Sequence, residues 1–154
     1  MPAYFFDSSA LVKRFAQESG RAFVLSLLRP SAKSRLYVAR ITEVEICAAL
    51  ARRQKGKSIS PSQATKGLRR LRYDLLQRFT QVAINENIII EAARLAETHA
   101  LRGYDAVQLA AALAANKERI SNRLLPLIMV SADMELNDAA QVEGFTVENP
   151  NNYP

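Results

Sequence analysis

The sequence predicts a single α/β domain with a mostly parallel central sheet flanked by helices. The chain has 154 residues, a length that suits one domain with a sizeable core. Short apolar runs alternate with longer stretches in which apolar residues recur at helical spacing. This alternation is typical of a parallel sheet built from βαβ units. Because no linker rich in Pro, Gly or Ser divides the chain, we expect one domain at 1–150 and a polar tail at 151–154.

Five short apolar runs are the expected strands. They cover about Ala3 to Phe6, Leu36 to Ala39, Val82 to Ile84, Leu127 to Val130 and Phe145 to Val147. When parallel strands are joined by right-handed crossovers, their carboxyl ends share one edge of the sheet. Ligands of such sheets bind just outside that edge. Residues that directly follow the strands are therefore the first place to look for a functional site.

The segments between these strands are expected to be helices with recognisable starts and stops. The first begins near Ser9 and is expected to end at Gly20. Ser60, Pro61 and Gln63 combine an N-cap, a proline at the first helical position and a capping-box partner, which indicates a strong helix start. The remaining helices are expected at about 22–28, 42–54, 88–100, 105–116 and 135–142.

The chain is basic, with a formal net charge of +6 and a pI near 9.8. This charge permits binding to a polyanion, chiefly through its phosphates. The densest basic stretch runs from Lys66 to Arg78. Its apolar residues recur at helical spacing, so we interpret the basic residues first as the solvated face of a helix. RNA binding by this stretch is the alternative.

The sequence contains a single cysteine and a single histidine, which excludes several kinds of site. The only cysteine, Cys47, permits no intrachain disulfide and, with the single His99, no zinc site of Cys and His ligands. We interpret Cys47 as a small apolar side chain and His99 as a helix-end residue, a general base being the alternative. No apolar run approaches the roughly 20 residues of a membrane helix. Asp7 comes too early for a signal peptide, so we expect a cytoplasmic protein without a membrane segment.

Three acidic residues lie near the predicted carboxyl edge of the sheet. Asp7 directly follows the first strand, Glu45 lies in the first helical turn after the second, and Asp133 comes just past the fourth. A further acid, Asp105, opens an alanine-rich helix. Carboxylates gathered in one pocket repel each other unless a cation neutralises them. Their hard oxygens suit Mg²⁺ or Mn²⁺, ions that activate water and neutralise charge on a phosphate.

Each of these four acids also has a purely local interpretation. Asp7 could cap the first helix, and Asp105 and Asp133 could cap theirs. Glu45 follows Thr42 by three residues, which fits a capping box, and by local pattern alone this is its better explanation. Four capped helices would be unremarkable in one protein, so the acids by themselves leave the site open.

Four segments of the sequence together resemble the motifs of PIN-domain proteins. They are Tyr4–Lys13 (YFFDSSALVK), Ala39–Glu45 (ARITEVE), Leu101–Ala110 (LRGYDAVQLA) and Ser131–Asp133 (SAD), the last followed by Leu136 and Gly144-Phe145. They occur in the order of the family and, with their flanks, span residues 4–150. The second segment has Ala39 where the family usually has serine. In size, the chain resembles the VapC toxins of type II toxin–antitoxin modules.

This resemblance implies a site of four carboxylates with two supporting hydroxyls. The carboxylates are those of Asp7, Glu45, Asp105 and Asp133, and the supporting hydroxyls are those of Ser9 and Ser131. Asp7 and Asp105 would be the main direct ligands of one or two Mg²⁺ or Mn²⁺ ions. The other two acids would complete the site directly or through water, and Ser9 would orient Asp7 or a bound water. The register of the second motif selects Glu45 over Glu43.

The resemblance further implies the hydrolysis of RNA phosphodiester bonds by a metal-activated water. Its expected partners are an RNA substrate and a small DNA-binding antitoxin whose tail covers the pocket, and a homodimer is expected. The alternatives are a catalytically weak RNA-binding or assembly module, a metal-dependent phosphatase, and a nuclease directed at DNA, since phosphate contacts do not report the sugar. A phosphoacceptor receiver domain is disfavoured because Ser8, rather than a second acid, follows Asp7.

Overall fold

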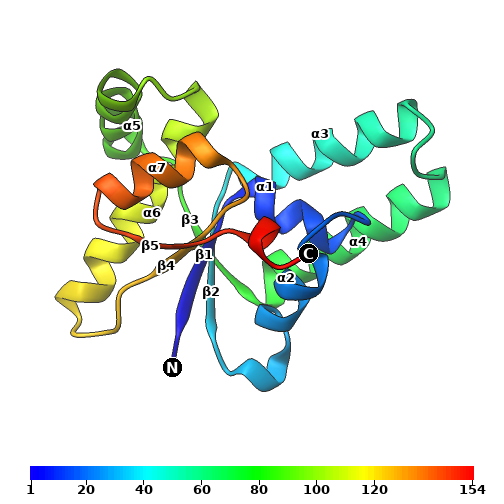
Figure 1. Ribbon diagram of the computed structural model, residues 1–154, viewed down its shortest axis with the longest axis horizontal. Helices are drawn as coiled ribbons and strands as arrows, with labels where there is room; N and C mark the ends of the chain where they lie inside the picture. Colours follow the sequence, from blue (N-terminus) through cyan, green and yellow to red (C-terminus); the bar gives the residue numbers. More distant parts are fainter.

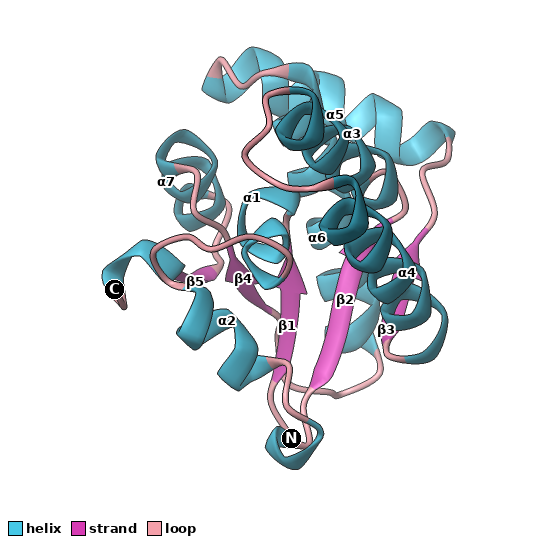
Figure 2. Cartoon of the chain, turned by 90° about the vertical axis from the view of Figure 1, so that its right-hand side faces the viewer, coloured by secondary structure: helices cyan, strands magenta, loops and turns pink.

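The computed structural model describes all residues from 1 to 154 and is built around a five-stranded parallel sheet. The strands are β1 (Ala3–Phe6), β2 (Arg35–Ala39), β3 (Phe79–Val82), β4 (Ile128–Val130) and β5 (Thr146–Glu148). Their order across the sheet is β3-β2-β1-β4-β5, and every neighbouring pair is parallel (Figure 2). From β1 the chain adds β2 and β3 on one side and then β4 and β5 on the other, so the strand order reverses between β1 and β4. The crevice at such a switch point is where ligands bind in open α/β sheets.

Helices cover both faces of this sheet, as Figure 1 shows. The α-helices are α1 (Ser8–Leu11), α2 (Arg21–Leu27), α3 (Thr42–Lys55), α4 (Pro61–Gln77), α5 (Glu86–His99), α6 (Gly103–Ser121) and α7 (Met134–Val142). Three short 3₁₀ turns, η1 (Val12–Arg14), η2 (Pro30–Ala32) and η3 (Pro150–Asn152), complete the chain. No helix is both long enough and apolar enough to span a membrane.

The core consists of two apolar clusters separated by the sheet. Successive strand residues point to opposite faces, so Phe5 packs in the cluster with Leu95 of α5 and Leu109 of α6. Its neighbour Phe6 packs in the other cluster, which includes Ile46 of α3. This alternation along β1 places helices on both sides of the strand that carries Asp7 at its end.

Helices α3 and α4 pack against each other and extend beyond the sheet (Figure 1). The predicted capping box begins α4: the Gln63 N–H donates to Ser60 Oγ at 3.1 Å, and the Ser60 N–H donates to Gln63 Oε1 at 2.8 Å. At the other end of α4, the buried Asp74 is paired with Arg14, at 2.5 Å, and with Arg78. The pair of helices is thus anchored at its base, where the chain returns to the sheet.

The structure corrects three predicted boundaries. The third strand is β3 at Phe79–Val82 rather than Val82 to Ile84, because Phe79 pairs with Leu36 of β2 and packs edge-on against Phe6. The first helix ends early, and Gly20 instead precedes α2 with a φ of +82°. Helix α6 continues to Ser121, past the predicted end at 116.

The last residues of the chain lie against α2 (Figure 1). The ring of Tyr153 stacks on Phe23 with centroids 4.0 Å apart, and its hydroxyl donates to Glu148 at 2.8 Å. A Cβ atom at Gly20 would lie 2.3 Å from the carbonyl oxygen of Pro150. The segment predicted to be a polar tail therefore makes tertiary contacts with the body of the domain.

Candidate active site

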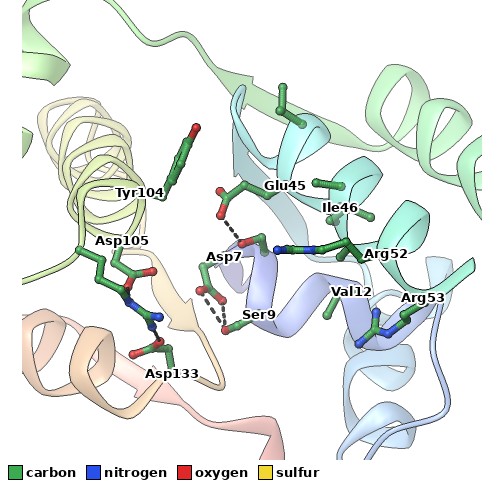
Figure 3. Close-up of a pocket in the computed structure, with 15 residues that line it drawn as sticks. Asp7, Ser9, Val12, Glu45, Ile46, Arg52, Arg53, Tyr104, Asp105 and Asp133 are labelled. Atoms are coloured by element: carbon green, nitrogen blue, oxygen red, sulfur yellow. Dashed lines mark hydrogen bonds and ion pairs between the residues drawn. The ribbon is translucent and has the colours of Figure 1, made fainter. Parts of the chain in front are cut away.

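A pocket of about 610 Å³ opens beyond the carboxyl ends of β1 and β4. Figure 3 shows that all four predicted acids line it. They come from four places in the chain: Asp7 from the end of β1, Glu45 from α3, Asp105 from α6 and Asp133 from the turn before α7. The fold thus brings to one pocket the three acids that the sequence places at the carboxyl edge of the sheet, together with Asp105.

Asp7 is the most deeply buried of these acids, with 2% of its surface exposed. The Ser9 hydroxyl lies 2.7 Å from Oδ1 and 2.9 Å from Oδ2, and the Ala10 N–H donates to Oδ1 at 3.1 Å. Asp7 therefore caps α1, as one of its two interpretations predicted, and it also faces the pocket. Burial raises the pKa of Asp7 to about 7, and the negative charge of Asp105 adds to this rise. The hydrogen bonds from Ser9 and Ala10 act in the opposite direction and lower the pKa.

The hydroxyls of Ser9 and Ser131 connect the ends of β1 and β4. The Ala132 N–H donates to Ser9 Oγ at 2.9 Å, and the two serine oxygens lie 3.4 Å apart. The N–H of Asp133 donates to Ser131 Oγ at 3.1 Å. These bonds join the turn that carries Asp133 to the residues beside Asp7, so the two acids are positioned by one hydrogen-bonded unit.

Glu45 is held from two sides. Its Oε1 accepts from Gln108 Nε2 at 2.7 Å, and its Oε2 accepts from the Ser8 hydroxyl at 2.9 Å. The capping-box interpretation of Glu45 is wrong, because the residue before α3 is Ile41 and no side chain caps the helix. Burial raises the pKa of Glu45, whereas both hydrogen bonds lower it.

Gln108 was not expected in the site from the sequence. It is 1% exposed and follows Asp105 by three residues on α6, among alanine and leucine side chains. Its Nε2 also donates to Thr42 Oγ1 at 2.9 Å, while its Oε1 has no partner. A long polar side chain on an otherwise apolar helix face is the signal in the sequence that could have revealed it.

Asp105 and Asp133 share the guanidinium of Arg102. Arg102 Nε donates to Asp105 Oδ2 at 3.2 Å, and its Nη2 donates to Asp133 Oδ2 at 2.9 Å. Burial, followed by repulsion from Asp133, raises the pKa of Asp105, and Arg102 opposes this. Asp133 also caps α7 by accepting from the Leu136 N–H at 3.0 Å. The capping interpretation of Asp105 is wrong, since α6 has no side-chain cap.

The four carboxylates surround the pocket without converging on one point. No three acidic, histidine or cysteine side chains are close enough to hold a metal ion in this arrangement. Yet neither Asp7 nor Glu45 has a cationic partner, and burial raises the pKa of both. A buried carboxylate at Asp7 and a half-buried one at Glu45, both without counter-charge, provide hard oxygen donors that fit a divalent cation such as Mg²⁺ or Mn²⁺.

The other candidate residues lie outside the pocket. His99 ends α5, as expected, and its Nε2 lies 2.9 Å from Glu143 Oε1. Cys47 is half-buried against the apolar cluster around Ile46. The basic stretch from Lys66 to Arg78 belongs mostly to α4, whose exposed face carries it.

Comparison with known proteins identifies relatives over most of the chain. Residues 4–123 match the model of the PIN domain. The chain is 34% identical over 114 residues to Ribonuclease VapC45 and to Ribonuclease VapC49, from two strains of Mycobacterium tuberculosis. In each case, the match covers 74% of this chain and 77% of the relative.

Solved structures show the same fold at lower identity. The chain aligns with VapBC2 from Rickettsia felis, solved bound to a DNA fragment from their promoter, with a TM-score of 0.62 and 15% identity. That alignment covers 96% of this chain and 98% of the other. A toxin–antitoxin complex from Klebsiella pneumoniae aligns with a TM-score of 0.60 and 19% identity, covering 96% and 97%. From the family match and the identity to its relatives, this chain belongs to the PIN-domain family.

Proposed function

We propose that this chain is an endoribonuclease that depends on Mg²⁺ or Mn²⁺ and acts as the toxin of a toxin–antitoxin pair. The observation that carries this proposal is the buried carboxylate of Asp7, which has no cationic partner and lies at the switch point of the sheet in a pocket shared with three further acids. Two relatives with 34% identity are ribonucleases by name, which supports RNA as the substrate class.

In the proposed site, Asp7 and Asp105 bind the cation, and Glu45 and Asp133 complete its surroundings directly or through water. When bound, the cation activates a water molecule and neutralises the charge that develops on the phosphate. Ser9 orients both oxygens of Asp7. In the proposed hydrolysis, the oxygen of water bonds to phosphorus as the bond between phosphorus and the 3′ oxygen breaks, and the leaving 3′ oxygen takes up a proton. The products therefore carry a 3′-hydroxyl and a 5′-phosphate.

The proposed partner in the cell is a small DNA-binding antitoxin whose tail covers the pocket. Support comes from the fold, which this chain shares with the toxin–antitoxin complex of Klebsiella pneumoniae and with VapBC2 of Rickettsia felis. A homodimer of the chain is part of the same proposal. Size-exclusion chromatography with light scattering, with and without a co-expressed neighbouring small protein, tests both associations.

The decisive experiment incubates purified protein with a structured RNA and Mn²⁺, with and without EDTA. We expect cleavage that requires the ion and is lost in Asp7→Asn. Cleavage in EDTA, or none with Mn²⁺, would contradict the proposal. Single-stranded DNA of the same sequence, run in parallel, tests the DNA-directed alternative, which predicts equal cutting of both polymers.

Two neighbouring glutamates on α3 provide a matched pair of variants. Glu45 lines the pocket, whereas Glu43 does not and instead lies 3.7 Å from Arg40. We expect Glu45→Gln to abolish cleavage and Glu43→Gln to keep most of it. The glutamine amide at 45 can still accept from Gln108, so both variants should fold equally well. The reverse result would show that the wrong glutamate has been assigned to the site.

A further inference from the structure

The pocket continues from the acidic residues along one face of α3. Val44 and Glu45, then Ala48 and Ala49, then Arg52 and Arg53 line it in succession, and these pairs follow each other at helical spacing. The wall therefore begins at an acid, passes two small side chains and ends at basic ones. Arg52 lies about 10 Å along the helix axis from Glu45. This distance along α3 leaves room for several linked units of a polymer, in addition to the phosphate that reacts beside the acids.

Arg52 and Arg53 differ in what they already bind. Arg53 is paired with Glu18, whereas the side chain of Arg52 is exposed and makes neither a hydrogen bond nor an ion pair within the chain. Figure 3 shows the side chain of Arg52 extending from α3 into the pocket. A free guanidinium beside a groove is suited to a phosphate, which it binds with two parallel hydrogen bonds.

Tyr104 stands on the opposite side of the same pocket (Figure 3). It is the second residue of α6, directly before Asp105, and it is 60% exposed. Its ring belongs to neither apolar cluster of the core. Packing therefore does not explain an aromatic residue at this position. Exposed aromatic rings near basic side chains are a common means by which proteins stack the bases of a single strand.

We propose that this groove is a subsite for single-stranded RNA, in which Tyr104 stacks on a base beside the cleaved phosphate and Arg52 binds a phosphate further along. The proposal deepens the ribonuclease function and rests on it. Bases in a duplex are stacked on each other, so their faces are closed to Tyr104. The small side chains of Ala48 and Ala49 let the sugar–phosphate chain approach α3 closely between the two contacts.

Binding can be measured apart from cleavage in the full-length chain carrying Asp7→Asn. The probes are a fluorescein-labelled 12-nucleotide RNA of mixed sequence and a duplex of the same sequence, titrated in Mg²⁺ and followed by anisotropy. We expect Tyr104→Ala to weaken binding of the single strand about tenfold, within the range for loss of one stacked base. Tyr104→Phe should stay within about twofold, because stacking uses the ring and not the hydroxyl. The duplex should bind weakly and respond to neither change.

Arg52→Ala should weaken binding and reduce the slope of log Kd against log salt by about one, the signature of one lost phosphate contact. The controls are Arg29→Ala and Arg35→Ala, two exposed arginines before and at the start of β2 that do not line this groove. Neither control should change affinity by more than about twofold. Equal losses in the controls would point to diffuse attraction by the basic surface and would overturn the subsite.

A spectroscopic readout identifies the stacking itself. RNA with a single 2-aminopurine placed at successive positions should show quenched fluorescence at one position when bound. The quenching should persist in Tyr104→Phe and disappear in Tyr104→Ala. If the protein cleaves RNA with Mn²⁺ but Tyr104→Ala binds normally, the subsite is wrong and the ribonuclease function stands. If it neither cleaves nor binds RNA and the groove instead takes a peptide, both proposals fail.

Discussion

The side-chain amide of Gln108 donates a hydrogen bond of 2.7 Å to Glu45, which lies 63 residues earlier in the sequence. Gln108 lies one turn beyond Asp105 on α6, and Glu45 lies in the first turn of α3. The bond therefore joins two helices that carry different acids of the same pocket. Because the same nitrogen also donates to Thr42, the amide is fixed in its orientation. Gln108 is a positioning residue for Glu45 in the proposed ribonuclease.

Replacing Gln108 with leucine should lower the rate of RNA cleavage about 10- to 100-fold, the usual effect of losing a side chain that orients a metal-site residue. The hydrogen bond from Gln108 lowers the pKa of Glu45, so its loss should raise that pKa further. The acidic limb of the pH–rate profile should then move to higher pH. Gln141→Leu, on the exposed face of α7, is the control. An equal loss at every pH would indicate only a structural defect.

The stability of the metal-free protein should depend on pH through Asp7. Its pKa is about 7 when folded and 3.8 in a model peptide, so the folded state binds this proton more tightly. The free energy of unfolding should therefore fall as pH rises from about 4 to 7, and Asp7 should add no further change above that. At about 1.4 kcal/mol per pKa unit, the fall amounts to a few kcal/mol at most.

Asp7→Asn should remove this dependence while keeping the cap of α1, since the asparagine oxygen can accept from Ala10. In EDTA at pH 8 the variant should melt at a higher temperature than the wild type, and at pH 4 the two should agree. Adding Mn²⁺ should raise the melting temperature of the wild type alone. If the variant is less stable than the wild type at pH 8, the prediction is wrong, because the charged form of Asp7 would then stabilise the folded state.

Arg102→Ala should strengthen Mn²⁺ binding. The guanidinium of Arg102 occupies one oxygen each of Asp105 and Asp133, and its side chain is 75% exposed. Its removal leaves the two acids repelling each other, so a divalent ion gains both as ligands. We expect affinity to increase about two- to fivefold by calorimetry, in keeping with an exposed ion pair. Arg94→Ala, an exposed arginine paired with Glu91 and Glu143, should leave it unchanged. Weaker binding in Arg102→Ala would mean that Arg102 supports the site.

Gly20→Ala should destabilise the fold strongly. Gly20 has a φ of +82°, which by itself costs a residue with a side chain about 1–2 kcal/mol. The added Cβ would also lie 2.3 Å from Pro150, so the contact between η3 and α2 must shift. Urea unfolding measures the loss. Gly103→Ala is the matched control, because no atom lies within 4 Å of its Cβ position, and its stability should hardly change.

Several features of this protein could be predicted from the sequence because they depend on neighbours along the chain. The alternation of Phe5 and Phe6 determines that β1 is covered on both faces. The strand that runs directly into Asp7 places this acid at the carboxyl edge, and the capping box at Ser60 marks the start of α4. The four motifs, in their order, indicated the family that comparison with known proteins then showed.

Other features were decided only by tertiary contacts. The local pattern around Glu45 favoured a cap, and only its place in the second motif assigned it to the site. Its hydrogen-bond partners are Ser8 and Gln108, 37 and 63 residues away. Arg102 bridges to Asp133 across 31 residues, and nothing in its local sequence indicates this. The register of β3 depended on the pairing of Phe79 with β2. Periodicity and capping are local properties, whereas the charge and orientation of a pocket depend on which distant side chains the fold brings within hydrogen-bonding distance.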